Sequence, residues 1–303
     1  MPDASVACGR AFAPSHVTGL VVPRTEARDP RARGSVGAGL VLSTGVIATA
    51  TWRPGSRRSV ALSSDRPASL EISEVVARRL LGARPGRLSV ALTHPLPIGQ
   101  GFGASAAGAL ATGLAVADAL GLPPRKAVEV AHLADLFGGG GLGGVAAILG
   151  GGLEVRLRPG LPPHGRIVRR PRSDRLLVGT VGRPLRTGTV LRDPGHQRSF
   201  DAGETLLTRL GRRPTWDRFW DVSEAFTDEV DLAVPRLRDV LRGLRRRGSR
   251  AAQAMFGGSF FATLPSPAAA RSVARWLRRS GATVWPVAVG SQGAHALGPP
   301  SPP

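Results

Sequence analysis

Apolar and polar residues alternate along this chain in two ways, one typical of strands and one typical of helices. From Phe12 to Ala50, short β-branched and apolar runs are separated by Gly, Pro and Arg, which predicts several short strands. The polar segment from Thr25 to Gly34 interrupts them and predicts a loop. Further strands are predicted at 87–92, 153–157, 175–181, 251–264 and 282–289. Helical periodicity is found at 69–82, 105–120, 125–137, 145–149, 201–210, 216–230, 234–246 and 267–281.

Strands and helices mixed in this order favour an α+β protein, in which helices cover antiparallel sheet. With 303 residues, the chain is long enough for two domains with ordinary cores. We expect an N-terminal domain over 1–165 and a C-terminal domain over 166–297, with the active site in the cleft between them. The tail at 298–303, rich in proline, is expected to be disordered.

The most informative stretch is PIGQGFGASAAGAL at 97–110, where a predicted strand leads through a glycine-rich turn into a helix of small residues. Gly99, Gly101 and Gly103 allow positive φ and let the backbone approach a ligand closely. Free N–H groups at the start of the helix would then hold phosphate. No Gly-Lys-Ser/Thr follows, and the spacing is not that of a dinucleotide fingerprint. Taken alone, the loop is equally consistent with a tight turn and with phosphate binding.

The next helix carries candidate polar residues on one face. Val128, His132 and Asp135 lie at i, i+4 and i+7 after the helix-starting prolines at 123–124. The glycine-rich run at 138–144 ends this helix and cannot itself form regular structure.

Composition narrows the class of protein. The N-terminus lacks the order of a signal peptide, and no apolar run approaches the roughly 20 residues that span a bilayer. The single cysteine, Cys8, excludes an internal disulfide and fits a cytoplasmic protein.

A formal charge of +20 raises nucleic acid as a partner. However, all the basic residues except Lys126 are arginine, Asn and Tyr are absent, and the cations are spread along the chain, which is typical of a GC-rich genome. The densest run, at 242–250, resembles the solvated end of a helix and has no accompanying aromatic ladder. We therefore expect no nucleic acid among its partners.

The glycine-rich block resembles the second motif of the GHMP small-molecule kinases, Pro-x-x-x-Gly-Leu-Gly-Ser-Ser-Ala-Ala. Phe102 in the leucine position brings it nearer to the archaeal pantoate kinase branch. Further segments resemble that branch in the same order along the chain, at 11–20, 34–46, 131–137, 141–160 and 254–262. The resemblance covers nearly the whole chain and is weakest between about 170 and 250.

This resemblance implies a two-domain fold, with an N-terminal domain like ribosomal protein S5, and ATP-dependent phosphorylation of pantoate to 4-phosphopantoate in coenzyme A biosynthesis. ATP and Mg²⁺ are the implied cofactors, and a homodimer is the implied assembly. The polar loop at 25–34 would lie near the substrate pocket. The residues implied to bind the nucleotide are Pro97, Gly99, Gly101, Phe102, Gly103, Ala104, Ser105, Ala106 and Ala107.

The resemblance also implies which residues bind the metal ion and the substrate. Ser105 and Asp135 would hold the metal ion and form the catalytic pair, Asp135 replacing a family glutamate. Ser35, His132 and Arg156 would bind the pantoate, with the Arg156 guanidinium clamping its carboxylate. Each residue also has a simpler interpretation: Ser105 as a helix cap, His132 as a core histidine, Arg156 as an exposed strand arginine.

One position departs from the family pattern. The family sequence Gly-Leu-Gly-Asp-Val has an aspartate that takes the proton from the acceptor hydroxyl, whereas this chain has Gly144 there. Because general base catalysis contributes about 10² to 10⁴ in rate, its loss predicts a slower enzyme that still binds phosphate. Two alternatives stay open: a GHMP kinase of homoserine, shikimate or a mevalonate-type alcohol, or a non-catalytic relative that binds nucleotide or nucleic acid.

Overall fold

The computed structural model describes residues 6–67, 69–181, 197–230, 233–255 and 257–298. Within these residues, the larger of two sheets is built around a hairpin of two long antiparallel strands, β1 (Ala7–Arg24) and β2 (Gly34–Arg53). The prediction of several short strands here is wrong. The register of the hairpin shifts between Pro14 and His16 and again between Thr18 and Leu20, so Pro14 and Gly19 lie at irregularities within a continuous strand, and the other glycines and Pro23 are paired.

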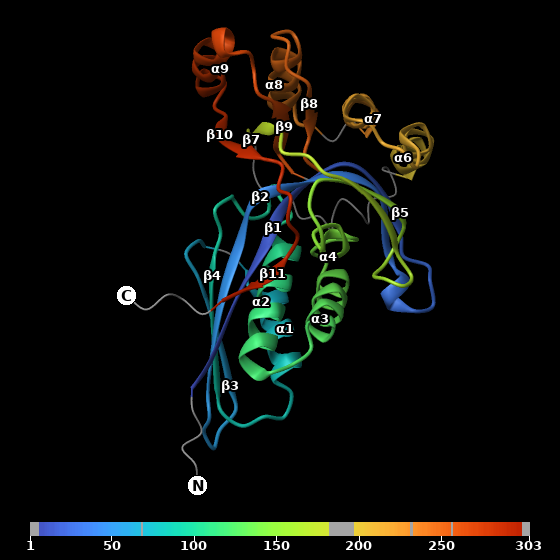
Figure 1. Ribbon diagram of the computed structural model, residues 1–303. Coiled ribbons are helices and arrows are strands. Elements are labelled where there is room, and N and C mark those ends of the chain that lie inside the picture. The colour runs from blue at the N-terminus through green and yellow to red at the C-terminus, as the bar shows by residue number, and fades with distance from the viewer. Residues whose placement is uncertain (1–5, 68, 182–196, 231–232, 256, 299–303) are drawn as a thin grey trace.

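Five further strands complete the larger sheet. They are β3 (Ser59–Ser64), β4 (Arg87–Thr93), β5 (Leu153–Arg158), β6 (Arg166–Arg170) and β11 (His295–Leu297). Two of them, β4 and β5, pair with different halves of β2. The order is β11-β1-β2-β4-β3, with β4 along the second half of β2, while β5 and then β6 extend from its first half. Figure 1 shows the hairpin arching over the green helices toward β5.

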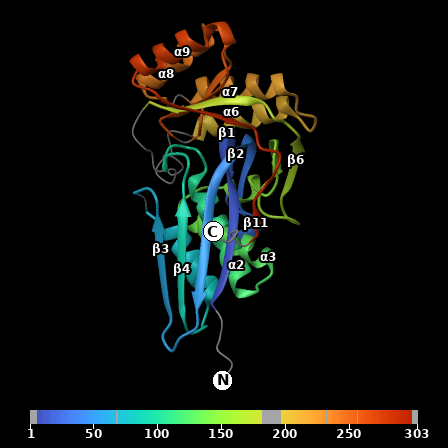
Figure 2. The same ribbon diagram turned by 60° about the vertical axis from the view of Figure 1, so that its left-hand side comes forward.

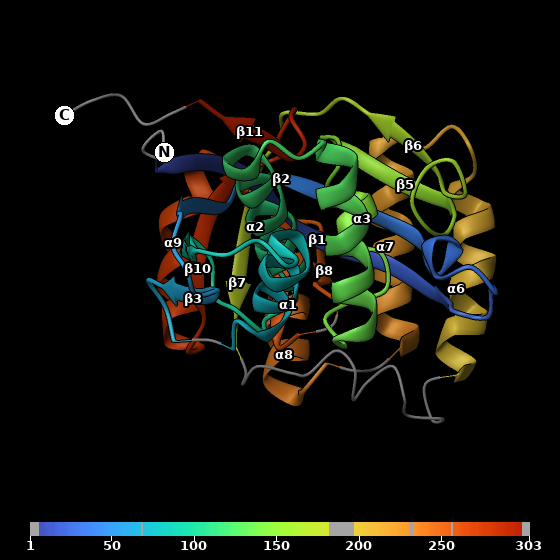
Figure 3. The ribbon, with the colours of Figure 1, turned by 90° about the horizontal axis from the view of Figure 1, so that it is seen from below.

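Three helices cover one face of this sheet, as Figures 2 and 3 show. They are α1 (Glu71–Leu81), α2 (Ala104–Leu120) and α3 (Pro124–Phe137). The central helix α2 is buried along almost its whole length, because its alanines and glycines let the sheet and both neighbouring helices approach closely. The short α4 (Gly144–Ala147) follows the glycine run after α3.

The second sheet is antiparallel, in the order β10-β7-β9-β8. Its strands are β7 (Arg175–Thr180), β8 (Ala251–Gln253), β9 (Ser259–Thr263) and β10 (Thr283–Ala288). The helices around it are α6 (Gln197–Leu210), α7 (Trp216–Val230), α8 (Pro235–Arg245) and α9 (Pro267–Arg279). A hydrophobic core shared by β1, β2, α6, α7 and this sheet joins the two halves of the molecule, and a separate core lies under α8 and α9.

The α+β architecture expected from the sequence is confirmed. The predicted strand at 251–264 is instead the hairpin of β8 and β9. The strands β3, β6 and β11 were not predicted, because each is only three to six residues long. The division at residue 165 stays a prediction; on its C-terminal side, β6 and β11 pair with the first sheet. Of the predicted disordered tail, all but Gly298 lies outside the described residues.

Candidate active site

The glycine-rich turn before α2 has the backbone conformation that its sequence predicts. Gly99, Gly101 and Gly103 have φ angles of 74°, 79° and 68°, in the left-handed region that favours glycine. At Gly101 a side chain is excluded as well, because its Cβ would lie 2.6 Å from the carbonyl oxygen of Ala254. The turn therefore depends on glycine for both its conformation and its packing.

Two segments distant in the sequence fix this turn in place. The His16 N–H donates a hydrogen bond of 3.1 Å to the Phe102 carbonyl, and the Ser259 hydroxyl donates one to the Gln100 carbonyl. The Phe102 ring is buried and meets the Trp285 ring edge-on, with 6.3 Å between centroids. Three of the motifs that the sequence places in order along the chain therefore converge here.

The turn opens onto a pocket of about 610 Å³. Gly103 is the N-cap of α2 and has no side chain to bond the first amides of the helix. Those N–H groups and the positive end of the helix dipole suit a phosphate group in this pocket.

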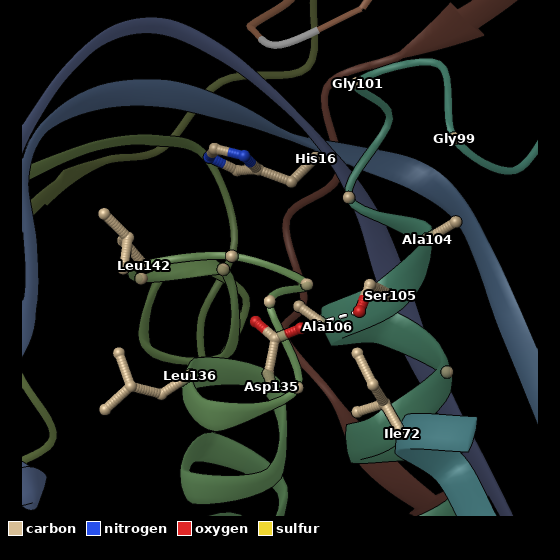
Figure 4. A pocket seen from close by; sticks show the side chains of 18 of the residues that line it. His16, Ile72, Gly99, Gly101, Ala104, Ser105, Ala106, Asp135, Leu136 and Leu142 are labelled. Atoms are coloured by element: carbon tan, nitrogen blue, oxygen red, sulfur yellow. Dashed lines mark hydrogen bonds between the residues drawn. The ribbon is translucent and has the colours of Figure 1, made fainter. Parts of the chain in front are cut away.

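Ser105, in the first turn of α2, and Asp135, near the end of α3, meet in the pocket (Figure 4). The Ser105 hydroxyl donates a hydrogen bond of 2.7 Å to Asp135 Oδ1. Burial raises the pKa of Asp135 to about 6, an effect that the hydrogen bond from Ser105 only partly offsets. Among the described residues no cation pairs with this buried carboxylate, and together with the hydroxyl beside it the carboxylate offers the oxygen ligands that Mg²⁺ prefers.

The glycine run after α3 lies directly against these two side chains. A Cβ at Gly140 would lie 2.1 Å from Ser105 Oγ and 2.3 Å from Asp135 Oδ1. A Cβ at Gly143 would lie 2.7 Å from Ser35 Oγ and 3.4 Å from Arg156 Nε. One backbone segment therefore spans both ends of the pocket, and side chains at these positions would displace the groups beneath it.

Another part of the pocket is lined by Ser35 from β2, Arg156 from β5 and His16 from β1, whose backbone also contacts the glycine-rich turn. All three are buried, between 2% and 3% exposed. Glu154, fully buried on the same strand as Arg156, accepts hydrogen bonds from Arg156 Nη1 and from His16 Nε2, the latter at 3.0 Å. This part of the pocket is thus formed by buried charged and polar side chains, whereas the glycine-rich turn offers backbone groups.

Most of the predicted site residues line this single pocket. They are Ser35, Gly99, Gly101, Gly103, Ala104, Ser105, Ala106, Asp135 and Arg156. The remaining four, Pro97, Phe102, Ala107 and His132, are not among the residues that line it in the described part of the chain. Phe102 and Ala107 have core side chains, so any contact with a nucleotide would come from the backbone.

His132 lies on α3, next to the short helical turn η1 (Pro30–Ala32). Burial lowers its pKa, and the backbone of Pro30 and Arg33 faces its ring. The loop at 25–34 therefore packs on α3 through this histidine.

The sequence reasoning missed His16, Glu154 and His94. Glu154 and Arg156 are two residues apart on a strand, a spacing that puts them on one face, so the pair was open to prediction. His16 could not be assigned in the same way, because its contact with Glu154 joins residues 138 positions apart. His94 lines the pocket near the start of α1, and its Nδ1 shares a hydrogen bond of 3.1 Å with the Ser64 hydroxyl.

The fold and this glycine-rich pocket are those of a small-molecule kinase class. Residues 70–152 match the family described as GHMP kinases N terminal domain. A phosphotransferase related to the CoA biosynthesis pathway has the same fold, with a TM-score of 0.84 and 27% identity over 96% of this chain and 98% of its own.

Similar proteins of known name show to which family within the GHMP kinases this chain belongs. The pantoate kinase of Thermococcus kodakarensis is 34% identical over 78% of this chain and 80% of its own length. That of Methanospirillum hungatei is 31% identical over 83% of this chain and 86% of its own. The chain therefore belongs to the pantoate kinase family of the GHMP kinases.

Proposed function

We propose that this protein transfers the γ-phosphoryl group of ATP to the 4-hydroxyl of pantoate, forming 4-phosphopantoate and ADP. The observation that carries the proposal is the pocket itself, which has an uncapped helix N-terminus and hard oxygen ligands at one end and a buried arginine at the other. The carboxylate of pantoate suits the arginine end of the pocket, and its 4-hydroxyl suits the end where the phosphates would lie.

The residues present fit ATP and Mg²⁺. The amides after Gly103 would hold the phosphates, and Ser105 with Asp135 would hold the metal ion. Within the described residues no three His, Cys, Asp or Glu side chains group as a metal site, so phosphate oxygens and water would complete the coordination. When bound, Mg²⁺ supplies charge neutralisation for the transferring phosphoryl group.

The acceptor would lie between the phosphate-binding turn and Arg156. Ser35 and Arg156 flank Gly143 and would bind the pantoate carboxylate, for which a planar guanidinium is well suited. His132 is not among the described residues that line the pocket. Any effect of His132 on pantoate binding would therefore be indirect, through the loop at 25–34 that it contacts.

The transfer would depend on positioning rather than on a base at residue 144. Gly144 has no side chain to accept the proton of the acceptor hydroxyl, and the carboxylates of the pocket lining are Asp135 and Glu71. Phosphoryl transfer needs its reacting oxygens held in line more than it needs proton removal, so phosphate oxygens can take the proton late in the reaction.

A coupled assay for ADP tests the proposal. With pantoate, ATP and Mg²⁺ we expect turnover, and with Ser105→Ala we expect it to fall about 100-fold because one group at the developing charge is removed. The same assay with homoserine, shikimate and mevalonate decides the acceptor. ADP formation that is independent of pantoate, or that is higher with another acceptor, would refute the pantoate assignment.

The described residues include no helix long and apolar enough to cross a membrane. A cytoplasmic location goes with the proposed use of ATP, and dimerisation stays a prediction that sedimentation of the purified protein would test.

A further inference from the structure

A buried group of four charged or polar side chains lies behind the acceptor end of the pocket. Glu154 is fully buried on β5 and bonded to both Arg156 and His16. Arg169, on the neighbouring β6, is close enough to attract Glu154, and its guanidinium donates to the carbonyls of Gly150 and Ala146 at 2.8 and 3.1 Å. The network therefore joins strands β1, β5 and β6 with the segment around α4.

The charges in this network do not cancel. Burial lowers the pKa of His16, and the neutral ring satisfies both its contacts: Nε2–H donates to Glu154, and Nδ1 accepts from Thr18 at 3.3 Å. Burial alone would raise the pKa of Glu154, but the attraction of Arg156 and the His16 hydrogen bond hold it below its usual value. Two arginines then face one carboxylate, so one positive charge is left in excess.

A hydrogen bond holds one side of the Arg156 guanidinium and leaves another side without a partner. Its Nη1 is held by Glu154, whereas its Nε is buried and has no hydrogen-bond partner among the described residues. Nε and Ser35 Oγ both lie next to the point where a Cβ of Gly143 would be, at 3.4 and 2.7 Å. A buried N–H without a partner is costly, so this edge is suited to an anionic group of the ligand.

We propose that Glu154, supported by His16, is a positioning residue that holds the Arg156 guanidinium edge-on to the carboxylate of the acceptor. This inference rests on the proposed function and deepens it, because it assigns recognition of the acceptor carboxylate to a network rather than to Arg156 alone. Glu154 does not contact the acceptor. It acts by restricting Arg156 to the orientation in which the guanidinium lines the pocket.

Two effects of Glu154 oppose each other, and this makes the inference testable. If Glu154 mainly weakens the positive field, its neutralisation strengthens binding of a carboxylate. If it mainly orients Arg156, its neutralisation weakens that binding. Supporting partners of a functional side chain typically contribute about 10- to 100-fold.

The test is Glu154→Gln, which keeps size and one acceptor oxygen but removes the charge. We expect KM for pantoate, and Kd for pantoate by calorimetry, to rise at least about tenfold, while kcat and KM for ATP stay within about twofold. Glu229→Gln, an exposed position on α7, is the matched control. A pantoate KM that is unchanged or lower, or an equal loss for ATP, overturns the inference.

A neutral acceptor separates positioning from general damage. For the triol in which a hydroxymethyl group replaces the carboxylate of pantoate, we expect wild type and Glu154→Gln to have similar KM values, and an equal increase for both acceptors would refute a carboxylate-specific role. If Glu154→Gln does not fold, Glu154→Asp replaces it with the same expected direction, because the shorter carboxylate cannot reach both His16 and Arg156.

The outcomes also distinguish this inference from the proposed function. If the wild type binds pantoate but does not phosphorylate it, the proposed function fails, and the calorimetric comparison still decides the role of Glu154. If the wild type does not bind pantoate, both fail.

Discussion

At the scale of single residues, the neighbours of Gly144 leave too little space for the side chain of an aspartate. Gly144 begins α4 and has helical backbone, so a side chain is not excluded by its conformation. However, its Cβ would lie 2.6 Å from the Cβ of Ala106 on α2, and 3.8 Å from Asp135 Oδ2. Helices α2 and α4 are therefore packed more closely than an aspartate at this position allows.

We expect Gly144→Asp alone to be poorly tolerated, and the pair Ala106→Gly with Gly144→Asp to be faster than Ala106→Gly alone. Ala106→Gly frees the space that the new aspartate needs, and a general base then contributes about 100-fold in kcat. Single-turnover measurement of phosphopantoate formation checks this. Equal rates for the double variant and for Ala106→Gly would mean that residue 144 cannot place a base on the acceptor hydroxyl.

The raised pKa of Asp135 has a consequence for stability. Because the folded protein holds this proton up to about pH 6 while the unfolded chain loses it near its ordinary pKa of 3.8, the free energy of unfolding falls as pH rises across that interval. Asparagine does not titrate, so in the absence of Mg²⁺ and nucleotide the variant Asp135→Asn should not show this fall in the free energy of unfolding.

The difference in free energy of unfolding between Asp135→Asn and wild type is therefore expected to be roughly 2 kcal/mol more favourable to the variant at about pH 7.5 than at about pH 4.5. Denaturant titration at both pH values measures it. Asp118→Asn, exposed on α2, is the control and should show no comparable gain. A pH-independent difference for Asp135→Asn would contradict the buried, unpaired state of this carboxylate.

At the scale of elements, the glycine segment between α3 and α4 connects the two ends of the pocket. Gly140 covers the Ser105 and Asp135 pair, whereas Gly143 covers Ser35 and Arg156. A side chain at Gly140 should therefore affect phosphoryl transfer, and one at Gly143 should affect pantoate binding, although the two positions are only three residues apart.

We expect Gly140→Ala to lower kcat, by about 100-fold, because the added methyl group separates Ser105 from Asp135. We expect Gly143→Ala instead to raise KM for pantoate, because its methyl group reaches Ser35 Oγ. Steady-state kinetics in both substrates distinguish the two. Gly55→Ala, which meets nothing closer than 3.8 Å in an exposed turn, is the control. The same kinetic defect in both glycine variants would contradict this division of the pocket.

At the scale of the whole molecule, the densest basic run is engaged within the protein. Arg245 pairs with Asp228 at 2.9 Å, and Arg250 with Asp221 at 2.6 Å, both acids on α7. The Arg247 guanidinium lies over the Trp276 ring on α9, 4.4 Å from its centroid. Tertiary contacts thus account for part of a charge run that could also indicate a nucleic-acid surface.

The whole molecule also explains why the family motifs are recognisable in the sequence. The strand β1, the turn at 99–103 and the segment before β9 are far apart in the chain, yet backbone hydrogen bonds and the close packing of Gly101 on Ala254 join them. These contacts bring the three motifs to one place in the fold, beside the pocket.

The sequence by itself determined the α+β class, most of the helices and the left-handed conformation of the glycine-rich turn. These follow from local rules, namely apolar periodicity and the φ that glycine permits. Ser105 and Asp135 were singled out by the family resemblance, and their roles in phosphate and metal binding stay predictions. Only the tertiary structure decided that β1 and β2 are continuous, that His132 packs under the loop at 25–34, and that His16 and Glu154 stand behind Arg156. Those outcomes depend on strand register and on contacts between residues more than a hundred positions apart, which no local pattern encodes.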